Sequence, residues 1–274
     1  MSEWIAAAQD GAILWLWQME GGAHPLEQHS ASADSPESLA ETAAALMPGV
    51  GGPIVACGLP QAGFRKVPCE PLDAAPLDLA SSPRRVAAIP GLAQENPAHV
   101  TQGAETKMAG FLALNPKFDG VLCLPGTETA WAHVSAGEVV SFQTFATADL
   151  ARDSAARLGL RAEAWDEPAF LETLSEVQAR PERLAGRIAS LRAEGLLAGL
   201  SENVARARLW GALVGAEMAA TRPYWLGQPV AVIGEGALAA IYVSAVTAQG
   251  AAPVQAKGQA MLLKGLAEAR ARLG

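Results

Sequence analysis

The chain has 274 residues, half of them hydrophobic, and a formal net charge of −8 at pH 7. This length is enough for one large domain or two domains of ordinary size around a substantial core. The basic residues are scattered among acids, which excludes nucleic-acid binding, because a phosphate backbone is met by clustered lysine or arginine. No apolar run approaches the roughly 20 residues that span a bilayer, and the first residues lack the pattern of a signal peptide. We therefore expect a soluble, cytoplasmic protein with no membrane partner.

The first part of the chain predicts a strand hairpin followed by mixed strands and helices. Asp10-Gly11 between two apolar runs is a strong hairpin signal, because glycine tolerates a positive φ. Ser35 followed by Pro36 is typical of a helix start, and Thr101 is expected to cap a later helix. The expected elements are strands at 4–8 and 13–19, a helix at 36–47, strands at 54–57 and 85–89, and a helix at 101–114, with irregular structure over 67–82.

The second part repeats the same kind of material around a long helical region. The pattern is helical from about 147 to 217, with breaks at Gly159, Pro168, Pro181 and Gly199. Interleaved strands and helices indicate an α/β protein, and two similar halves joined by the helix at 101–114 suggest two lobes with a cleft. The other expected elements are strands at 120–124, 129–134, 138–142, 229–234 and 252–255, and helices at 237–249 and 259–273.

The three cysteines, Cys57, Cys69 and Cys123, are widely spaced and form no Cys-x-x-Cys pair. This spacing argues against a disulfide framework and against a zinc site, so we expect buried, reduced thiols. The four histidines share no ligand spacing with cysteines or acids, and no metal site is predicted from them.

Several segments, in order along nearly the whole chain, resemble the 2-dehydro-3-deoxygalactonokinase family of the actin–hexokinase superfamily. No single segment is specific, but their mutual distances make a joint signal. The segments are Trp4–Trp17, Ala56-Cys57-Gly58, Gly63–Pro68, Ala88–Leu92, Gln102–Lys107, Leu124–Glu128 with Trp131, Gly211–Thr221 and Val232–Gly234.

The resemblance implies an α/β, two-lobed actin/hexokinase-like (ribonuclease-H-like) fold with an interlobe cleft. Residues 1–116 would form the N-terminal lobe, with the first phosphate-loop hairpin and the sugar side. Residues 117–274 would form the C-terminal lobe, with the second phosphate loop and the adenosine side, and the terminal helix could pack across the lobes.

The resemblance also implies an activity. Such an enzyme transfers the γ-phosphoryl group of ATP, with Mg²⁺, to the 6-hydroxyl of 2-dehydro-3-deoxy-D-galactonate, a step of galactonate catabolism. The partner would be a small sugar acid, and a homodimer is compatible with the chain. The residues do not identify a catalytic base.

The first phosphate-binding turn that the resemblance implies is Asp10-Gly11. In this superfamily, backbone donors of the turn hold a phosphate and an aspartate helps to place Mg²⁺. A gap-free alignment puts Ala8 at the family's aspartate and Ala12 at its serine or threonine position, while Asp10 falls at a glycine position. A plain hairpin turn is the alternative interpretation.

The second cradle would consist of two turns in the C-terminal half. Gly126 and Thr127 follow a strand and could offer backbone N–H groups and a hydroxyl to phosphate. Gly234, Glu235 and Gly236 stand between a strand and a helix, where the superfamily contacts adenosine. Each segment is also an ordinary glycine-containing turn when taken alone.

The resemblance places the sugar side at Arg65 and at the helix start that holds Gln102, Glu105 and Thr106. Gln102 stands where the family has arginine, so Arg65 is the remaining cation for a carboxylate. The alternatives are a solvated arginine and a first-turn acid that stabilises the helix dipole. Trp4, Trp15 and Trp17 could line a binding surface, although packing is the favoured interpretation.

A second hypothesis remains open. Acid, glycine and hydroxyl positions of the first turn are changed together, at Ala8, Asp10 and Ala12. The chain could therefore be a catalytically inactive kinase homologue, a pseudokinase that binds a sugar acid or an interaction partner.

Overall fold

The computed structural model describes residues 3–22, 24–73, 75–161 and 164–273. The chain divides into two compact units. Unit 1 comprises Met1–Leu122, Ala132–Phe142 and Ala256–Gly274, and unit 2 comprises Cys123–Trp131 and Gln143–Gln255.

The strands are β1 Glu3–Asp10, β2 Ile13–Glu20, β3 Pro25–Ala31, β4 Ile54–Cys57, β5 Phe64–Lys66, β6 Leu77–Ala80, β7 Val86–Ala88, β8 Gly91–Glu95, β9 Ala98–Thr101, β10 Gly120–Leu124, β11 Thr129–Ser135, β12 Glu138–Phe145, β13 Val230–Ile233 and β14 Val254–Ala256. The α-helices are α1 Pro36–Leu46, α2 Ala104–Leu114, α3 Thr147–Leu158, α4 Glu167–Ala179, α5 Leu184–Ala198, α6 Glu202–Ala220, α7 Arg222–Trp225, α8 Gly236–Thr247 and α9 Gly258–Ala271. Short 3₁₀ turns occupy η1 Pro60–Ala62 and η2 Pro181–Arg183.

Two sheets share one strand order, apart from an additional edge strand, β6, in the first. The first is β3-β2-β1-β4-β7-β6, and the second is β12-β11-β10-β13-β14. In the first sheet, β1 runs antiparallel to β2 and parallel to β4, and β4 runs parallel to β7. The strands β5, β8 and β9 form a small third sheet. The α/β class predicted from the sequence is therefore confirmed.

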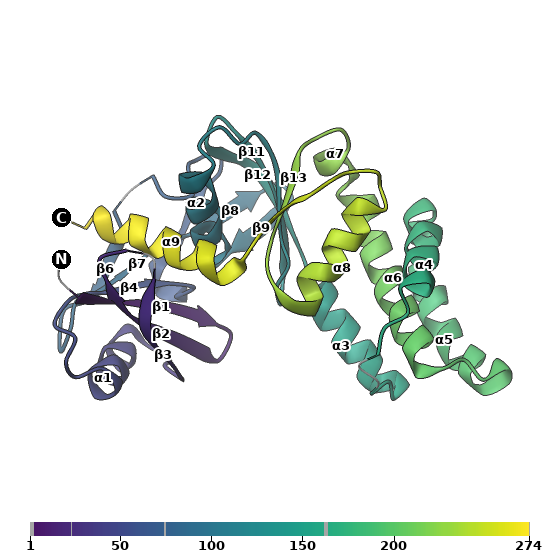
Figure 1. Cartoon of the computed structure of the whole chain (residues 1–274), viewed down its shortest axis with the longest axis horizontal. Helices are drawn as coiled ribbons and strands as arrows, with labels where there is room; N and C mark the ends of the chain where they lie inside the picture. Colours follow the sequence, from purple (N-terminus) through teal and green to yellow (C-terminus); the bar gives the residue numbers. More distant parts are fainter. Residues whose placement is uncertain (1–2, 23, 74, 162–163, 274) are drawn as a thin grey trace. The chain divides into compact units, whose positions relative to one another are not determined.

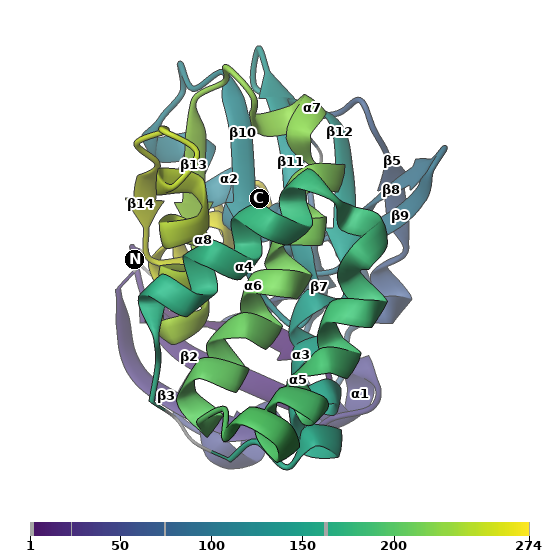
Figure 2. The ribbon, with the colours of Figure 1, turned by 90° about the vertical axis from the view of Figure 1, so that its right-hand side faces the viewer.

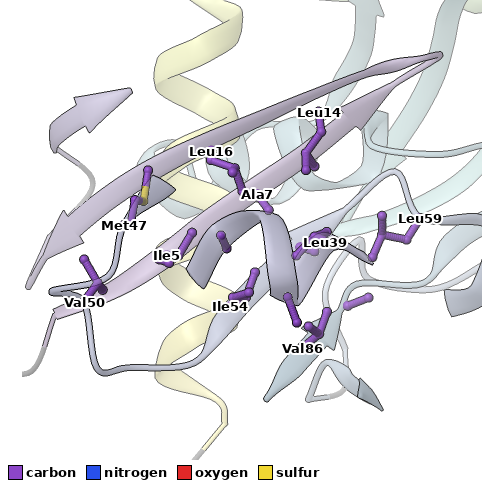
Figure 3. Close-up of a cluster of buried hydrophobic side chains, with 14 of the residues drawn as sticks. Ile5, Ala7, Leu14, Leu16, Leu39, Met47, Val50, Ile54, Leu59 and Val86 are labelled. Atoms are coloured by element: carbon purple, nitrogen blue, oxygen red, sulfur yellow. The ribbon is translucent and has the colours of Figure 1, made fainter. Parts of the chain in front are cut away.

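Alternation along β1 explains how the first sheet is covered on both faces. Ile5 and Ala7 point to a fully buried cluster that includes Leu39 of α1 (Figure 3). The intervening side chains, among them Trp4 and Ala6, point to the other face, where the cluster includes residues of α2 and α9. Because side chains alternate along a strand, a nearly continuous apolar run is what a strand buried on both faces requires.

The helices α2 and α9 pack closely within unit 1 (Figure 1). Gly265 of α9 makes the close approach: a Cβ there would lie 2.0 Å from the carbonyl oxygen of Thr106. The terminal helix therefore packs on α2 and on strands of the first sheet.

Unit 2 contains the helical region that the sequence predicts. The helices α3, α4 and α5 each pack against α6, and in Figure 2 these four helices face the viewer. Leu209 and Leu213 of α6 meet Ala151 of α3 and Leu191 of α5 in one buried cluster. Within the residues described, no helix is long and apolar enough to cross a membrane.

Several local predictions are confirmed and others are wrong. The Ser35 hydroxyl accepts a hydrogen bond from the Ser38 amide, 3.1 Å away, and so caps α1 as expected. Thr101 does not cap α2: it ends β9, and Gly103 is the N-cap residue. The strand predicted at 85–89 is β7, which ends at Ala88, and a further strand that was not predicted, β8, begins at Gly91.

Strand β3, strand β6 and the third sheet were not predicted. Strand β3 is polar and mostly exposed, and the other strands are short and carry no clear alternation. The cysteine prediction is confirmed in part: Cys57, Cys69 and Cys123 are free, and Cys57 and Cys123 are buried. Cys69 is only half-buried, because it lies beside a strand edge where it pairs with Val139.

Candidate functional site

The turn between β1 and β2 has two residues, Gly11 and Ala12. Asp10 pairs with Ile13 across it, and Gly11 has a φ of +57°. Ala12 has no positive φ, so the turn matches the type II′ pattern with glycine at its first central position. The Gln9 side-chain amide donates to the Gly11 carbonyl over 3.2 Å and steadies the turn. The predicted hairpin is thus confirmed, and its tip is exposed.

The hairpin decides which carboxylate is available in this part of unit 1. Ala8 is buried, with 7% of its surface exposed, and packs in the cluster that holds Trp4 and Trp17. Asp10 follows two residues later, so strand alternation puts it on the same face as Ala8, and it is exposed. An apolar side chain cannot ligate a metal, and Asp10 is the acid nearest in sequence to the family's aspartate position.

The two candidate turns of unit 2 lie against each other. Pro125 is buried at the end of β10, while Thr127 is exposed in the loop before β11. Gly234 follows β13, and a Cβ built on it would lie 3.6 Å from Cδ of Pro125. Gly236 begins α8 with a φ of +70°. The segments 125–128 and 234–236 therefore lie next to each other in unit 2.

In these two turns, the groups that could bind an anion are backbone N–H groups and the Thr127 hydroxyl. The N-terminus of α8 has the positive end of a helix dipole and first-turn N–H groups that make no bond within the helix. Glu128 and Glu235 are both exposed beside these turns. These carboxylates would oppose a phosphate unless a cation screens them.

A buried carboxylate that was not predicted from the sequence lies behind these turns. Glu217 of α6 is 2% exposed and accepts hydrogen bonds from Trp131, Thr147 and Tyr242. Burial raises its pKa to about 7, against the effect of these three bonds. The signal was present in the sequence, because Glu217 is the only charged residue within the apolar stretch 209–220.

The helix start on the predicted sugar side is held from within. Glu105 is fully buried and accepts from the Thr101 hydroxyl at 2.8 Å and the Gly103 amide at 2.7 Å. Burial is the main cause that raises its pKa. Thr106 is also fully buried, whereas Gln102 is exposed. Glu105 therefore caps its own helix, and of these residues Gln102 is the one open to solvent.

Arg65 is bound to the turn that follows its strand. Its terminal nitrogens donate to the carbonyl oxygens of Glu70 at 3.0 Å and Pro71 at 2.5 Å, and to the Asp73 carboxylate. The side chain is 18% exposed. It is not the freely solvated arginine of the alternative interpretation, and it holds the 70–73 turn in place.

The three tryptophans of the hairpin serve mainly the core. Trp4 and Trp17 are each 3% exposed and belong to one apolar cluster, against which the half-buried Trp15 packs. Packing, the favoured interpretation, is therefore confirmed for Trp4 and Trp17.

Comparison with known proteins gives consistent relatives. The family model described as 2-keto-3-deoxy-galactonokinase matches residues 3–269. A curated protein of Rhizobium meliloti (strain 1021), named as a probable 2-dehydro-3-deoxygalactonokinase, DgoK1, is 30% identical over 218 residues. The match covers 72% of this chain and 71% of that protein.

Solved structures have the same fold. A Sinorhizobium meliloti protein assigned as a 2-dehydro-3-deoxygalactonokinase superposes with a TM-score of 0.87 at 24% identity, over 100% of this chain and 99% of that one. An activator of the 2-hydroxyisocaproyl-CoA dehydratase from Clostridium difficile, solved with bound ADPNP, superposes with a TM-score of 0.51 at 7% identity. That match covers 98% of this chain and 93% of the other. At these identities the likeness concerns the fold alone.

Proposed function

We propose that this chain, which belongs to the 2-keto-3-deoxy-galactonokinase family, is a sugar-acid kinase that phosphorylates 2-dehydro-3-deoxy-D-galactonate with ATP. The observation that carries the proposal is the family match over residues 3–269. The name of the Rhizobium meliloti relative supports the substrate, and the ADPNP of the Clostridium difficile structure supports a nucleotide as phosphoryl donor.

The nucleotide would bind along the two adjoining turns of unit 2. Backbone N–H groups around Gly126 and the Thr127 hydroxyl would hold phosphate oxygens, and Gly234, Glu235 and Gly236 would line the adenosine. Support comes from the position of Gly234 against Pro125, which brings both turns within reach of one ligand. Phosphoryl transfer depends mainly on such positioning and on charge neutralisation.

The first hairpin would supply the carboxylate for Mg²⁺. Ala8 is buried and apolar, so the cation would depend on Asp10, with the Gly11 amide facing phosphate. Bound Mg²⁺ supplies charge neutralisation on the transferred phosphoryl group. It would also screen Asp10, which otherwise repels phosphate.

The sugar acid would bind on the side of unit 1 that carries α2. Gln102 is exposed and would donate to the substrate carboxylate, with Arg65 as the nearby positive charge. Glu105 and Thr106 would act by keeping the helix start in place, since both are buried. The 6-hydroxyl oxygen would form a bond to the γ-phosphorus while the bond from that phosphorus to the bridging oxygen of ADP breaks, and the hydroxyl proton would pass to solvent.

The division into lobes at residues 1–116 and 117–274 stays a prediction. A cytoplasmic location belongs to the proposal, supported by three free cysteines, which persist in a reducing compartment. A homodimer stays a prediction, which light scattering on the purified chain tests.

Two measurements test the function. Calorimetry with Mg-ATP should give a dissociation constant in the millimolar range or below. A coupled ADP-release assay should then show turnover with 2-dehydro-3-deoxy-D-galactonate and none without a sugar acid. Absence of heat at several millimolar Mg-ATP, together with absence of ADP release, would contradict the proposal and favour a non-catalytic relative.

A further inference from the structure

The carboxylate of Glu217 joins elements of unit 2 that are far apart in the sequence. The Trp131 Nε1–H donates to it over 2.6 Å, the Tyr242 hydroxyl donates over 2.9 Å, and the Thr147 hydroxyl donates as well. The Thr129 and Tyr242 hydroxyls lie a further 2.9 Å apart. Strand β11 and helices α3, α6 and α8 therefore meet at one buried polar cluster, which we call the Glu217 cluster.

Two members of the Glu217 cluster stand directly behind the candidate nucleotide turns. Thr129 is the first residue of β11 and follows the 125–128 segment without a gap. Tyr242 lies on α8, six residues after Gly236, which is about 9 Å along a helix axis. Strand β11 continues from the 125–128 turn and helix α8 continues from the 234–236 turn. Because a strand and a helix are stiff along their length, the Glu217 cluster restrains the end of each turn.

The turns also approach each other closely at a second place, on the side away from the Glu217 cluster. A Cβ added to Gly234 would lie 3.6 Å from Cδ of Pro125, so the backbone at Gly234 lies close to the proline ring. The two turns are thus connected at two places: by the Thr129 and Tyr242 hydroxyls at one, and by the approach of Gly234 to Pro125 at the other. The relative position of the two turns is set at both ends.

We propose that Glu217 is a positioning residue that holds the 125–128 and 234–236 turns at a fixed separation, and that nucleotide affinity depends on this separation. The inference rests on the proposed function, because it takes these turns as the nucleotide site. Glu217 itself is buried, so it would act through the turns and not by contact with the nucleotide.

The donors around Glu217 explain why an acid suits the position. The Trp131 indole can only donate, so it requires an acceptor, whereas the Thr147 and Tyr242 hydroxyls can donate or accept. Glutamine would give Trp131 a carbonyl oxygen and turn its amide group toward the hydroxyls. Alanine would leave the buried indole N–H and both hydroxyls without this partner, which is costly in a protein interior.

The test compares two buried tryptophans of unit 2. Trp131→Phe removes a donor of the Glu217 cluster, and Trp225→Phe removes the indole that donates to the Met218 carbonyl at 3.0 Å. Both changes leave a similar cavity and lower the thermal stability. We expect Trp131→Phe to raise the KM for ATP roughly 3- to 30-fold while the KM for the sugar acid is unchanged. Trp225→Phe should leave both values unchanged.

Milder variants keep the proposal testable where Trp131→Phe fails to fold. Tyr242→Phe removes a single oxygen and should raise the KM for ATP severalfold. Glu217→Gln should behave nearly as the wild type, whereas Glu217→Ala should lose nucleotide affinity. Equal effects of Trp131→Phe and Trp225→Phe on the KM for ATP, or no effect of Tyr242→Phe, would overturn the inference.

Amide hydrogen exchange gives a readout that needs no nucleotide. In Tyr242→Phe, exchange should accelerate in both 125–128 and 234–236 and stay unchanged in the 70–73 turn of unit 1. If the wild type fails to bind Mg-ATP but this joint acceleration occurs, the proposed function fails and the coupling of the turns stands. Unchanged exchange in either turn would refute the coupling itself.

Discussion

The turn between β1 and β2 and the loop between β10 and β11 occupy the same place in two sheets of one strand order, yet they differ in chemistry. The first is a tight two-residue turn with Asp10 beside it. The second is longer, carries Gly126 and Thr127, and touches Gly234. A common backbone arrangement therefore leaves the ligand chemistry of each turn to a few side chains.

The buried acids behind the two regions show a second difference. Glu105 of unit 1 is satisfied within five residues, by Thr101 and Gly103, so it fixes one helix start. Glu217 of unit 2 collects donors from β11, α3 and α8. The first acid is a local cap, and the second links distant elements. Replacement of Glu217 should consequently disturb more elements of its unit than replacement of Glu105.

The largest expected effect concerns the first turn. If Asp10 supplies the carboxylate for Mg²⁺, Asp10→Asn should lower kcat by about 100-fold or more, because charge placed at a reacting phosphoryl group carries much of the catalysis. Steady-state assays across Mg²⁺ concentrations measure this. Glu20→Gln, at the exposed opposite end of the same hairpin, is the control and should change little. Similar activity in both variants would remove Asp10 from the site.

The second expected effect concerns pH. The pKa of Glu217 rises from 4.5 to about 7 on folding, so the folded chain keeps this proton where the unfolded chain has lost it. The free energy of unfolding should therefore fall as pH rises from about 5 to 7 and level off above, by about 3 kcal/mol in total. Urea titrations at several pH values measure the slope.

Glu217→Gln cannot titrate and serves as the control for this slope. Burial also raises the pKa of Glu105, which adds a slope of the same sign in both proteins. The difference between wild type and Glu217→Gln isolates the Glu217 contribution. Parallel curves for the two proteins would show that Glu217 does not titrate in this range.

A third prediction asks whether the face of β1 at Ala8 serves packing. Ala8→Asp would bury a carboxylate in an apolar cluster and should lower stability by about 2 kcal/mol. Ala12→Asp, at the exposed turn, should have little effect. Thermal unfolding compares the two. Equal tolerance would indicate that the Ala8 face is open, and that the family's acid can be restored there.

The smallest effect separates the two roles of Arg65. Arg65→Gln should lower stability by about 1 kcal/mol, because the 70–73 turn loses its hydrogen bonds. It should also raise the KM for the sugar acid severalfold. Asp73→Asn disturbs the same turn and retains the guanidinium, so its KM should stay near the wild-type value. A matching rise in both variants would assign Arg65 to structure alone.

Much of the fold could be predicted because its signals are local. The Asp10-Gly11 turn, the Ser35 cap and the apolar run of β1 each act within a few residues. The helix α2 begins at Ala104, three residues after the predicted start. Thr101 has a side chain that is typical of a helix cap, but it is the last residue of β9. The Gly103 N–H is instead capped by the side-chain carboxylate of Glu105, and sequence patterns do not distinguish such a carboxylate from any other first-turn acid.

The candidate site was predicted only as separate turns. That the turns with Gly126 and Gly234 lie next to each other follows from the contact of Gly234 with Pro125, more than a hundred residues away in the chain. The hydrogen bonds of Arg65 to its neighbouring turn and the burial of Glu105 could not be predicted from the sequence either. The partners of a side chain depend on residues that come close only in the folded chain, and the local periodicity of the sequence carries no information about them.

The sequence alone determined the α/β class, the family and the chemistry available at each turn, because residue type and short-range spacing fix strands, turns and donors. Only the tertiary structure decided which polar groups are buried and with whom they pair. Glu217 illustrates the reason: a carboxylate among apolar residues is costly until Trp131, Thr147 and Tyr242 surround it, and those donors converge only when the strands and helices pack.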